Sequence, residues 1–324
     1  MGLETVGEAE ELVDYSYASS IVVSLHEELD EPDQVTLEQP PVHPVKAFQR
    51  AFEESIVESL EGPESAATKP AGPQDAEARR RLMLANDDYP ATYNARWRSR
   101  PGAKHHPLWK LLAQISFGVH LLHQRLAKSD EEVIKILQNH LMEINSFFRY
   151  TLDDFDLALK DVSERISYLR LPLEHVNIFD TMLDDRNFRN SIIEGNEKIE
   201  QVLHRTSRYL NDALIDTRNG KEASIQALEF FNSLGRDWTV GNRRLGSVFG
   251  NIFACAEQWL KLFDECERKG NNLDRSLTDL RGILNEMIKR AGAASRRSLV
   301  GRLLFRLLIC FQFEPNAAIV CDSN

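Results

Sequence analysis

The sequence predicts an all-α protein: an elongated antiparallel helical bundle with helices of about 40 to 50 residues, preceded by a disordered acidic tail. Three observations carry this prediction. Apolar residues recur in steps of three and four through most of residues 107–291, which is the spacing of one face of a helix. Proline, which breaks helices, occurs only once between residues 108 and 292, at Pro172. The alternating runs of Val, Ile and Thr that are typical of strands do not occur there.

Charge divides the 324-residue chain into two parts. Residues 1–90 contain 20 Asp or Glu and 6 Lys or Arg, whereas the rest contains 30 and 33, so the net charge of −11 comes from the first part. A high net charge with few apolar residues indicates disorder. We therefore expect a disordered acidic tail that contains proline over residues 1–104, in which 61–81 is a linker. A helical bundle over 105–292 and a basic, apolar segment over 293–324 should follow.

The sequence of the first part of the bundle predicts a helix of medium length, a long helix and a short one. Pro107 can occupy the first position of a helix that runs to about Ala127. Ser129 begins the pattern Ser-Asp-Glu-Glu, in which Glu132 completes a capping box, and an apolar stripe follows. Pro172 should end this second helix, because proline removes a hydrogen-bond donor and restricts the residue before it. A short helix over 173–184 should come next.

The next segment poses a choice between a helix and a turn. Apolar residues keep heptad spacing from Phe188 onward, but Asn219-Gly220 is a dipeptide that is typical of tight turns. The same steps of three and four return to apolar residues in phase at Ala223 and Phe230. Because a turn would rarely preserve this phase, we predict one helix over about 186–234.

Two further helices should complete the bundle. The first follows Gly241 and should end at Lys269-Gly270, because a basic last turn followed by glycine is typical of a helix end. A separate last helix should cover 273–291. The residues expected to face inward in the first of them are Leu245, Val248, Ile252, Cys255, Trp259 and Leu262.

Two stretches of the bundle resemble a known family. Together, LPLEHVNIFDTMLDDRNFRNSIIEGNEKIE (171–200) and HPLWKLLAQISFGVHLL (106–122) resemble an uncharacterised family of helix-rich, coiled-coil proteins from filamentous fungi. The resemblance covers roughly residues 105–292 and not the tail. It implies a helical body, and it carries over no activity and no catalytic residues.

No motif of catalysis or cofactor binding accompanies the predicted helices. The chain lacks the phosphate-binding glycine motifs, the G-x-S-x-G motif and the H-E-x-x-H motif. His120 and His123 have a spacing that can hold a metal, but no third ligand on their helix completes a set. Asp153, Asp154 and Asp156 could bind a cation, but a solvated helix face is the preferred interpretation. We therefore predict no catalytic, cofactor-binding or metal-binding residues.

Two segments of the tail contain more apolar residues than is typical of a disordered chain. Residues 19–31 resemble a SUMO-interacting motif, because a β-prone run is followed by acids and could add to the edge of a partner's sheet. The alternative is an inert or body-packed patch. Residues 44–60 place apolar side chains on one helix face, but their charges oppose the helix dipole, so this helix should form only against a partner or against the body. The candidate partner-binding residues are Ile21, Val22, Val23, Leu25, Phe48, Phe52 and Ile56.

The C-terminal segment is both basic and apolar. Arg296, Arg297, Arg302 and Arg306 lie in or just before an apolar run that is too short and too charged to span a bilayer. Two interpretations stay open for it. The segment is an interfacial helix that binds anionic lipid through these arginines, or it is a last bundle helix that covers the core with its arginines in water.

These patterns favour a non-enzymatic scaffold or adaptor that acts through its bundle and its tail segments. A peripheral membrane protein is the alternative, and an enzyme without recognisable motifs is the third possibility. Protein partners are expected, a homo-oligomer is possible because heptad seams also pair between chains, and a nucleic-acid partner is disfavoured by the acidic chain. The acidic N-terminus lacks the apolar core of a signal peptide, so we expect an intracellular, cytoplasmic protein that is not secreted.

Overall fold

The computed structural model describes residues 40–60, 75–86, 97, 102–235 and 237–312, and all regular structure in these ranges is helical. The predicted all-α class is confirmed. The disorder predicted for 1–39, 61–74 and most of 87–101 lies outside the described residues. The helices are η2 (Lys46–Phe48), α2 (Gln49–Leu60), α3 (Ala76–Ala85), α5 (Pro107–Gln124), α6 (Asp130–Glu174), α7 (Val176–Met182), α8 (Arg186–Leu234), η3 (Asp237–Thr239) and α9 (Arg243–Gln312).

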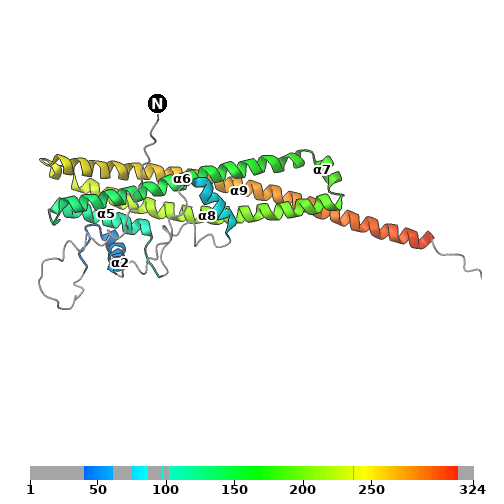
Figure 1. The fold of residues 1–324 in the computed structure, drawn as a ribbon, viewed down its shortest axis with the longest axis horizontal. Helices are drawn as coiled ribbons and strands as arrows, with labels where there is room; N and C mark the ends of the chain where they lie inside the picture. The colour runs from blue at the N-terminus through cyan, green and yellow to red at the C-terminus, as the bar shows by residue number, and fades with distance from the viewer. Residues whose placement is uncertain (1–39, 61–74, 87–96, 98–101, 236, 313–324) are drawn as a thin grey trace, which may run out of the picture. The chain divides into compact units, whose positions relative to one another are not determined.

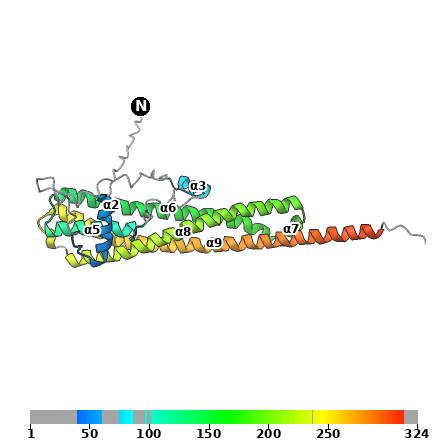
Figure 2. The same cartoon turned by 90° about the horizontal axis from the view of Figure 1, so that it is seen from below.

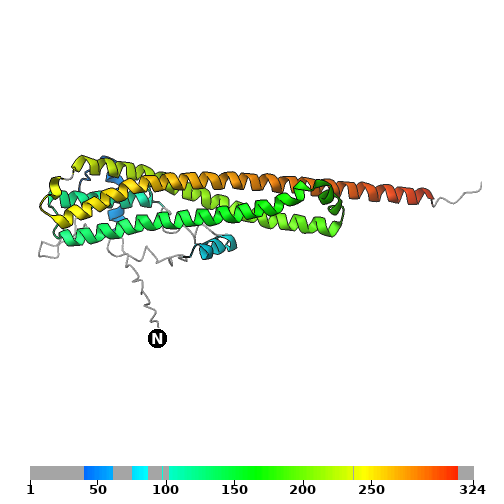
Figure 3. The same cartoon turned by 90° about the horizontal axis from the view of Figure 1, so that it is seen from above.

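The chain divides into two compact units. The first unit consists of Met1–Phe155 and Asn211–Gly270. In it, α5 lies beside the parts of α6, α8 and α9 that belong to this unit (Figure 1, Figure 3). The indole of Trp259 in α9 donates a hydrogen bond to Asn145 of α6, 2.9 Å away. The largest fully buried side chains of this unit include Leu108, Leu112, Ile115, Phe147, Phe155, Phe231, Trp259 and Phe263.

The second unit consists of Asp156–Leu210 and Asn271–Asn324. Within it, α7 connects the end of α6 to the beginning of α8 (Figure 2). Phe179 of α7 and Leu183 just after it pack against α9, where the buried residues are Met287, Ala291 and Ala294. The side chain of Asp180 in α7 also binds Arg290 of α9, with 3.1 Å between Nη1 and Oδ2. This short helix therefore closes the core of the second unit by both apolar and ionic contacts.

The helix α8 runs without a break through Asn219-Gly220, as the heptad phase predicted. Gly220 is buried, and the reason for a glycine here is space rather than a turn. A Cβ atom added to Gly220 would lie 2.6 Å from Cε1 of Phe263 and 2.8 Å from Cδ1 of Leu108. Both of these side chains are fully buried. The missing side chain thus lets α8 approach α5 and α9 closely.

Replacing Gly220 by alanine should destabilise the protein by about 2 kcal/mol, because the new methyl group overpacks a full core. Gly195 of the same helix is the matched control, since nothing lies within 4 Å of a Cβ added there. Gly195→Ala should leave stability unchanged or raise it by up to about 1 kcal/mol, because alanine favours the helix. Urea denaturation gives both free energies of unfolding. Equal stability of the two variants would contradict this account of Gly220.

The helix α9 corrects the prediction for the C-terminal part of the bundle. One helix covers Arg243–Gln312, so neither the end at Lys269-Gly270 nor a separate helix over 273–291 exists. Gly270 is buried and keeps the phase of its neighbours. Val248, Cys255 and Leu262, expected inside, are only half-buried. The buried positions follow alternating steps of four and three: Leu245, Phe249, Ile252, Ala256, Trp259, Phe263, Cys266, Gly270, Leu273, Leu277, Leu280, Leu284, Met287, Ala291 and Ala294.

The structure also moves the helix ends around Pro172. The helix α6 begins at Asp130, and the amide of Glu132 donates to the hydroxyl of Ser129 at 3.4 Å, as the capping box predicted. It ends at Glu174, two residues beyond Pro172, and α7 covers Val176–Met182 rather than 173–184. A proline in the last turn removes only one hydrogen bond, so the helix can end shortly after it.

Candidate functional site

Residues 40–60, which the sequence assigned to the tail, fold against the bundle. The helices η2 and α2 pack on α5 and bury the face that carries Phe48, Ala51, Phe52 and Ser55. The ring centroids of Phe52 and Phe117 are 4.3 Å apart, which is a close aromatic contact. Of the two outcomes left open for this helix, the described one is folding against the body. We call the contact between residues 40–60 and the α5 region the α2 docking site.

A buried histidine connects the start of this segment to α5. The Nε2 atom of His43 donates to the carbonyl oxygen of Ala113, 2.9 Å away, and its Nδ1 atom accepts from the amide of Val45 at the same distance. The ring lies between Phe48, Phe52 and Phe117. Burial lowers the pKa of His43 below its usual value, although the hydrogen bonds to Ala113 and Val45 raise it. His43 therefore acts as a neutral hydrogen-bonding anchor.

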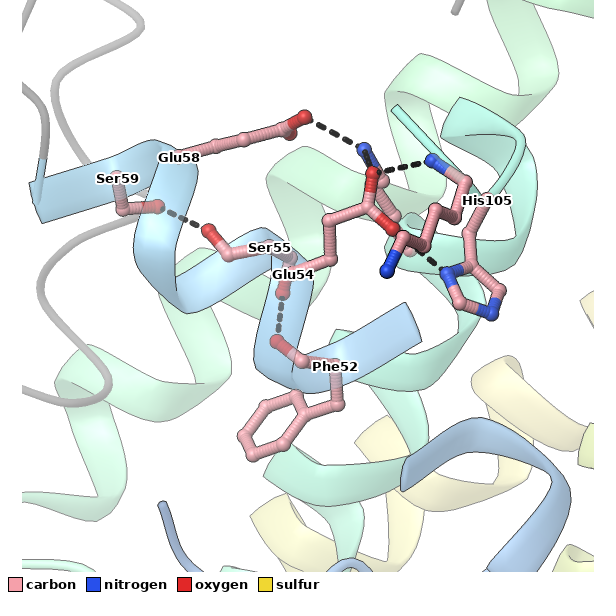
Figure 4. Close-up of polar contacts among 8 residues, drawn as sticks. Phe52, Glu54, Ser55, Glu58, Ser59 and His105 are labelled. Atoms are coloured by element: carbon pink, nitrogen blue, oxygen red, sulfur yellow. Dashed lines mark hydrogen bonds and ion pairs between the residues drawn. The ribbon is translucent and has the colours of Figure 1, made fainter. Parts of the chain in front are cut away.

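Acidic side chains on α2 meet basic groups at the beginning of α5 (Figure 4). Lys110 binds Glu58 at 2.6 Å and Glu54 at 3.0 Å, measured from its Nζ atom. Glu54 also accepts hydrogen bonds from the amide of Lys104 at 2.9 Å and from Nδ1 of His105 at 2.6 Å. Burial raises the pKa of Glu54, but these hydrogen bonds outweigh it and lower the pKa to about 2. The charges thus fix the orientation of α2, while its aromatic face supplies the buried area.

A second helix from the predicted tail is held by a buried ion pair. The linker predicted over 61–81 is wrong from residue 76 onward, where α3 begins. Arg79 of α3 binds Asp154 of α6 with 2.8 Å between Nη2 and Oδ1, and both side chains are less than one-tenth exposed. The guanidinium also lies 4.6 Å from the ring centroid of Tyr150. The solvated face predicted for Asp153, Asp154 and Asp156 is therefore wrong for Asp154, whose carboxylate is buried and paired, whereas the other two residues are exposed.

The predicted partner-binding residues have different outcomes. Phe48 and Phe52 are buried in the α2 docking site and Ile56 is half-buried, so the folded chain does not offer these rings to solvent. The other predicted partner-binding residues, Ile21, Val22, Val23 and Leu25, lie outside the described residues. Sequence reasoning missed the polar half of the site. The spacing of Glu54 and Glu58 placed both acids on one helix face, but nothing in the sequence identified Lys110, 52 residues after Glu58, as their partner.

The structure also contains a histidine–aspartate pair, which is an arrangement found in some catalytic sites. Nε2 of His106 lies 2.8 Å from Oδ1 of Asp216, and both side chains are nearly buried. Nδ1 of His106 accepts from the amide of Leu108 at the start of α5, so the ring hydrogen is on Nε2 and is donated to Asp216. Burial raises the pKa of Asp216, although the hydrogen bond from His106 lowers it. Because both ring nitrogens of His106 are used, its imidazole caps α5 and offers no lone pair to a substrate.

Cys266 and His123, two other groups that could react, pack against other parts of the fold. Burial raises the pKa of the Cys266 thiol to about 12, so this buried cysteine is no nucleophile at neutral pH. The ring of His123 lies against Trp238, with centroids 5.2 Å apart. Within the described ranges, no group of three His, Cys, Asp or Glu side chains could hold a metal ion.

The predicted lipid-binding arginines lie at the end of α9. Arg296 and Arg297 are exposed, and Arg297 binds the exposed Asp184 at 3.2 Å. The side chains of Arg302 and Arg306 lie outside the described residues, although their backbone is helical. In the part of the chain that the structure describes, no helix combines the length and the apolar character that crossing a bilayer requires.

Comparisons of the chain with known protein families, curated proteins and solved structures found no match. The resemblance to a fungal helix-rich family therefore stays a prediction. The α2 docking site combines aromatic contacts around Phe117 with the basic side chain of Lys110, and it is the feature from which we argue a function.

Proposed function

We propose that this chain is a non-enzymatic, intracellular scaffold or adaptor that binds acidic amphipathic helices on the α5 surface. One observation supports the proposal: α5 already holds such a helix, α2, by contacts that recognise both its apolar face and its charge. Helix-in-groove binding uses anchors at i, i+3, i+4 and i+7. Phe48 of η2 and Phe52 and Ser55 of α2 have the i, i+4, i+7 spacing and are buried.

The contacts also give the surface selectivity for an acidic helix. Lys110 is almost completely buried, and its ammonium group is shared between Glu54 and Glu58. A helix without acids at these two positions would leave the ammonium buried and unpaired, which costs far more than an exposed pair contributes. The favoured partner is therefore a helix with two aromatic anchors four residues apart and acids two and six residues after the second anchor.

In this proposal α2 is the occupant that a partner must replace. A tethered segment has an effective concentration in the millimolar range, so α2 competes strongly with a partner helix that binds from solution. A partner that carries a longer apolar face, or a change that weakens α2, would shift the balance. The adaptor then binds its partner only when α2 leaves α5.

A peptide-binding experiment with the full chain tests this proposal. Phe48→Ala/Phe52→Ala removes the anchors of the chain's own α2, so a labelled peptide of residues 40–60 should bind this variant and raise its fluorescence anisotropy. The wild-type chain should bind the peptide much more weakly, because its own α2 occupies α5. Val57→Ala is the matched control, since Val57 lies on the exposed side of α2 and its loss should leave α2 in place.

The charged edge is tested with the same assay. A peptide with Glu54→Lys/Glu58→Lys should not bind the opened variant, because it brings two lysines toward Lys110. Capture of partners from cells should likewise increase in Phe48→Ala/Phe52→Ala and be lost when Lys110→Glu is added. If the opened variant binds neither the peptide nor a partner, α2 is only a structural part of the fold and the proposal is wrong.

A further inference from the structure

The last described buried position of α9 in the second unit lies well before the end of this helix. Its last buried positions are Met287, Ala291 and Ala294. The next two seam positions are Ser298, which is half-buried, and Gly301. Neither offers a large apolar side chain to a core, yet the helix continues to Gln312. Among the α9 residues whose burial is described, the core contacts thus stop at Ala294.

A separate apolar face begins where the seam ends. Four large apolar side chains are more than half exposed: Leu299, Val300, Leu303 and Leu304. Residues three and four positions apart share one face of a helix, so these side chains lie on one broad side of α9. At 3.6 residues per turn, the centre of this face lies roughly 170° around the helix from the seam positions. The four exposed side chains therefore point away from the core of the second unit.

The basic charge around this face indicates which kind of partner surface it can bind. Residues 281–306 contain seven Lys or Arg and a single acid, Glu286. Two of these arginines, Arg290 and Arg297, are bound to Asp180 and Asp184. Arg296 is exposed, and no carboxylate of the described residues lies within ion-pair distance of it. A second copy of the chain would bring the same basic residues together, whereas an anionic surface complements both the arginines and the leucines.

We propose that residues 296–304 of α9 form an interfacial helix that binds anionic lipid bilayers. The exposed leucines enter the boundary between headgroups and acyl chains. Arg296, one turn before Leu299 and Val300 on the same side, reaches back to lipid phosphates while its methylene groups stay among the acyl chains. Apolar burial and charge attraction then act together. The helix lies in the interface and does not cross it.

Vesicle co-sedimentation of the full chain tests the proposal. The chain should bind phosphatidylcholine vesicles that contain about 30% phosphatidylserine, an anionic lipid of the cytoplasmic leaflet. It should not bind vesicles of pure phosphatidylcholine. Binding should weaken as salt is raised from about 0.1 M to about 0.5 M. Arg296→Gln should bind about fivefold more weakly, which corresponds to about 1 kcal/mol for one basic residue at the surface.

A matched pair of variants separates the apolar face from general charge. Leu303→Glu/Leu304→Glu should abolish binding, and both side chains are exposed, so the fold should persist. Val240→Glu, at a residue that is 82% exposed in the first unit, should bind like the wild type. Hydrogen exchange with and without vesicles should slow only at amides near residues 296–312.

Three results would overturn the proposal. The wild type does not bind anionic vesicles, or Leu303→Glu/Leu304→Glu binds them as well as the wild type does. Alternatively, sedimentation shows a dimer that this double variant dissociates, without any vesicle binding, in which case the face pairs with a second copy.

Discussion

Asp154→Asn is expected to release α3 from the first unit. The amide cannot neutralise Arg79, whose side chain is only 7% exposed, so the buried guanidinium would lose the counter-charge that Asp154 supplies. Removing one partner of a buried pair destabilises proteins by about 3 to 5 kcal/mol. We expect α3 to leave its site while the rest of the unit stays folded. The free energy of this local opening of residues 75–86 should therefore fall by about 3 kcal/mol.

Limited proteolysis measures this release directly. Trypsin cleaves after arginine, and α3 contains Arg79, Arg80 and Arg81 in sequence, of which the first two are buried. Cleavage at these residues, identified by mass spectrometry, should be fast in Asp154→Asn and slow in the wild type. Asp153→Asn is the matched control, because Asp153 is the exposed neighbour on α6 and should not change the rate.

A double variant distinguishes the lost ion pair from damage to α6. Replacing both partners, in Arg79→Met/Asp154→Leu, removes the two charges together and keeps apolar volume, a change that is often neutral for buried pairs. This variant should therefore resist trypsin better than Asp154→Asn does at the sites that remain. If it is cleaved as fast as the single variant, the pair does not hold α3 in place.

The heptad phase of the apolar residues predicted α8 correctly and contained the information for α9 as well. Around Gly220, the steps of three and four continue in phase, and the helix is continuous. Around Gly270 they also continue, from Phe263 and Cys266 to Leu273 and Leu277, and again the helix is continuous. A basic last turn followed by glycine was the weaker signal, because buried contacts on both sides of Gly270 stabilise the helix more than local preferences destabilise it.

The folded parts of the predicted tail were harder to foresee. Asp75 was a readable signal, since its side chain accepts from the amide of Ala78 and caps α3. Nothing local, however, indicated that Arg79 would be buried, because its partner Asp154 is 75 residues away. The anchor His43 contacts Ala113 through a backbone carbonyl, which no side-chain pattern reveals. Composition predicts disorder only when no distant surface accepts the segment.

Acid should destabilise the first unit through His140. This histidine of α6 is almost completely buried, and within the described structure its Nε2 atom has no hydrogen-bond partner. Its Nδ1 atom is 3.9 Å from a carboxylate oxygen of Glu143, and this distance is too long for a hydrogen bond. The Glu143 side chain is also partly exposed to water. Burial therefore dominates and lowers the pKa of His140 from 6.5 to about 4.

The direction of the pH effect follows from this lowered pKa. Below pH 6.5 the unfolded chain binds a proton at His140 that the folded chain does not bind until about pH 4. The stability is therefore complete above pH 6.5 and is lost as the pH falls toward 4. The whole shift corresponds to about 3 kcal/mol, of which about 2 kcal/mol should be lost between pH 7 and pH 5. Glu54, with its pKa of about 2, contributes mainly below its usual value of 4.5, so pH 5 largely separates the two groups.

Urea denaturation at pH 7 and pH 5 measures this loss, and His140→Leu should remove most of it. The leucine keeps apolar volume in the core and cannot bind a proton, so the variant should also be at least as stable as the wild type at pH 5. His43 has a pKa that burial lowers as well, so a smaller pH dependence should remain in His140→Leu. His204→Gln, at an exposed position of α8, should keep the full pH dependence. An NMR titration that gives His140 a pKa near 6.5 would contradict the proposed desolvation, because a hydrated imidazole in the folded chain would bind its proton as readily as in the unfolded chain.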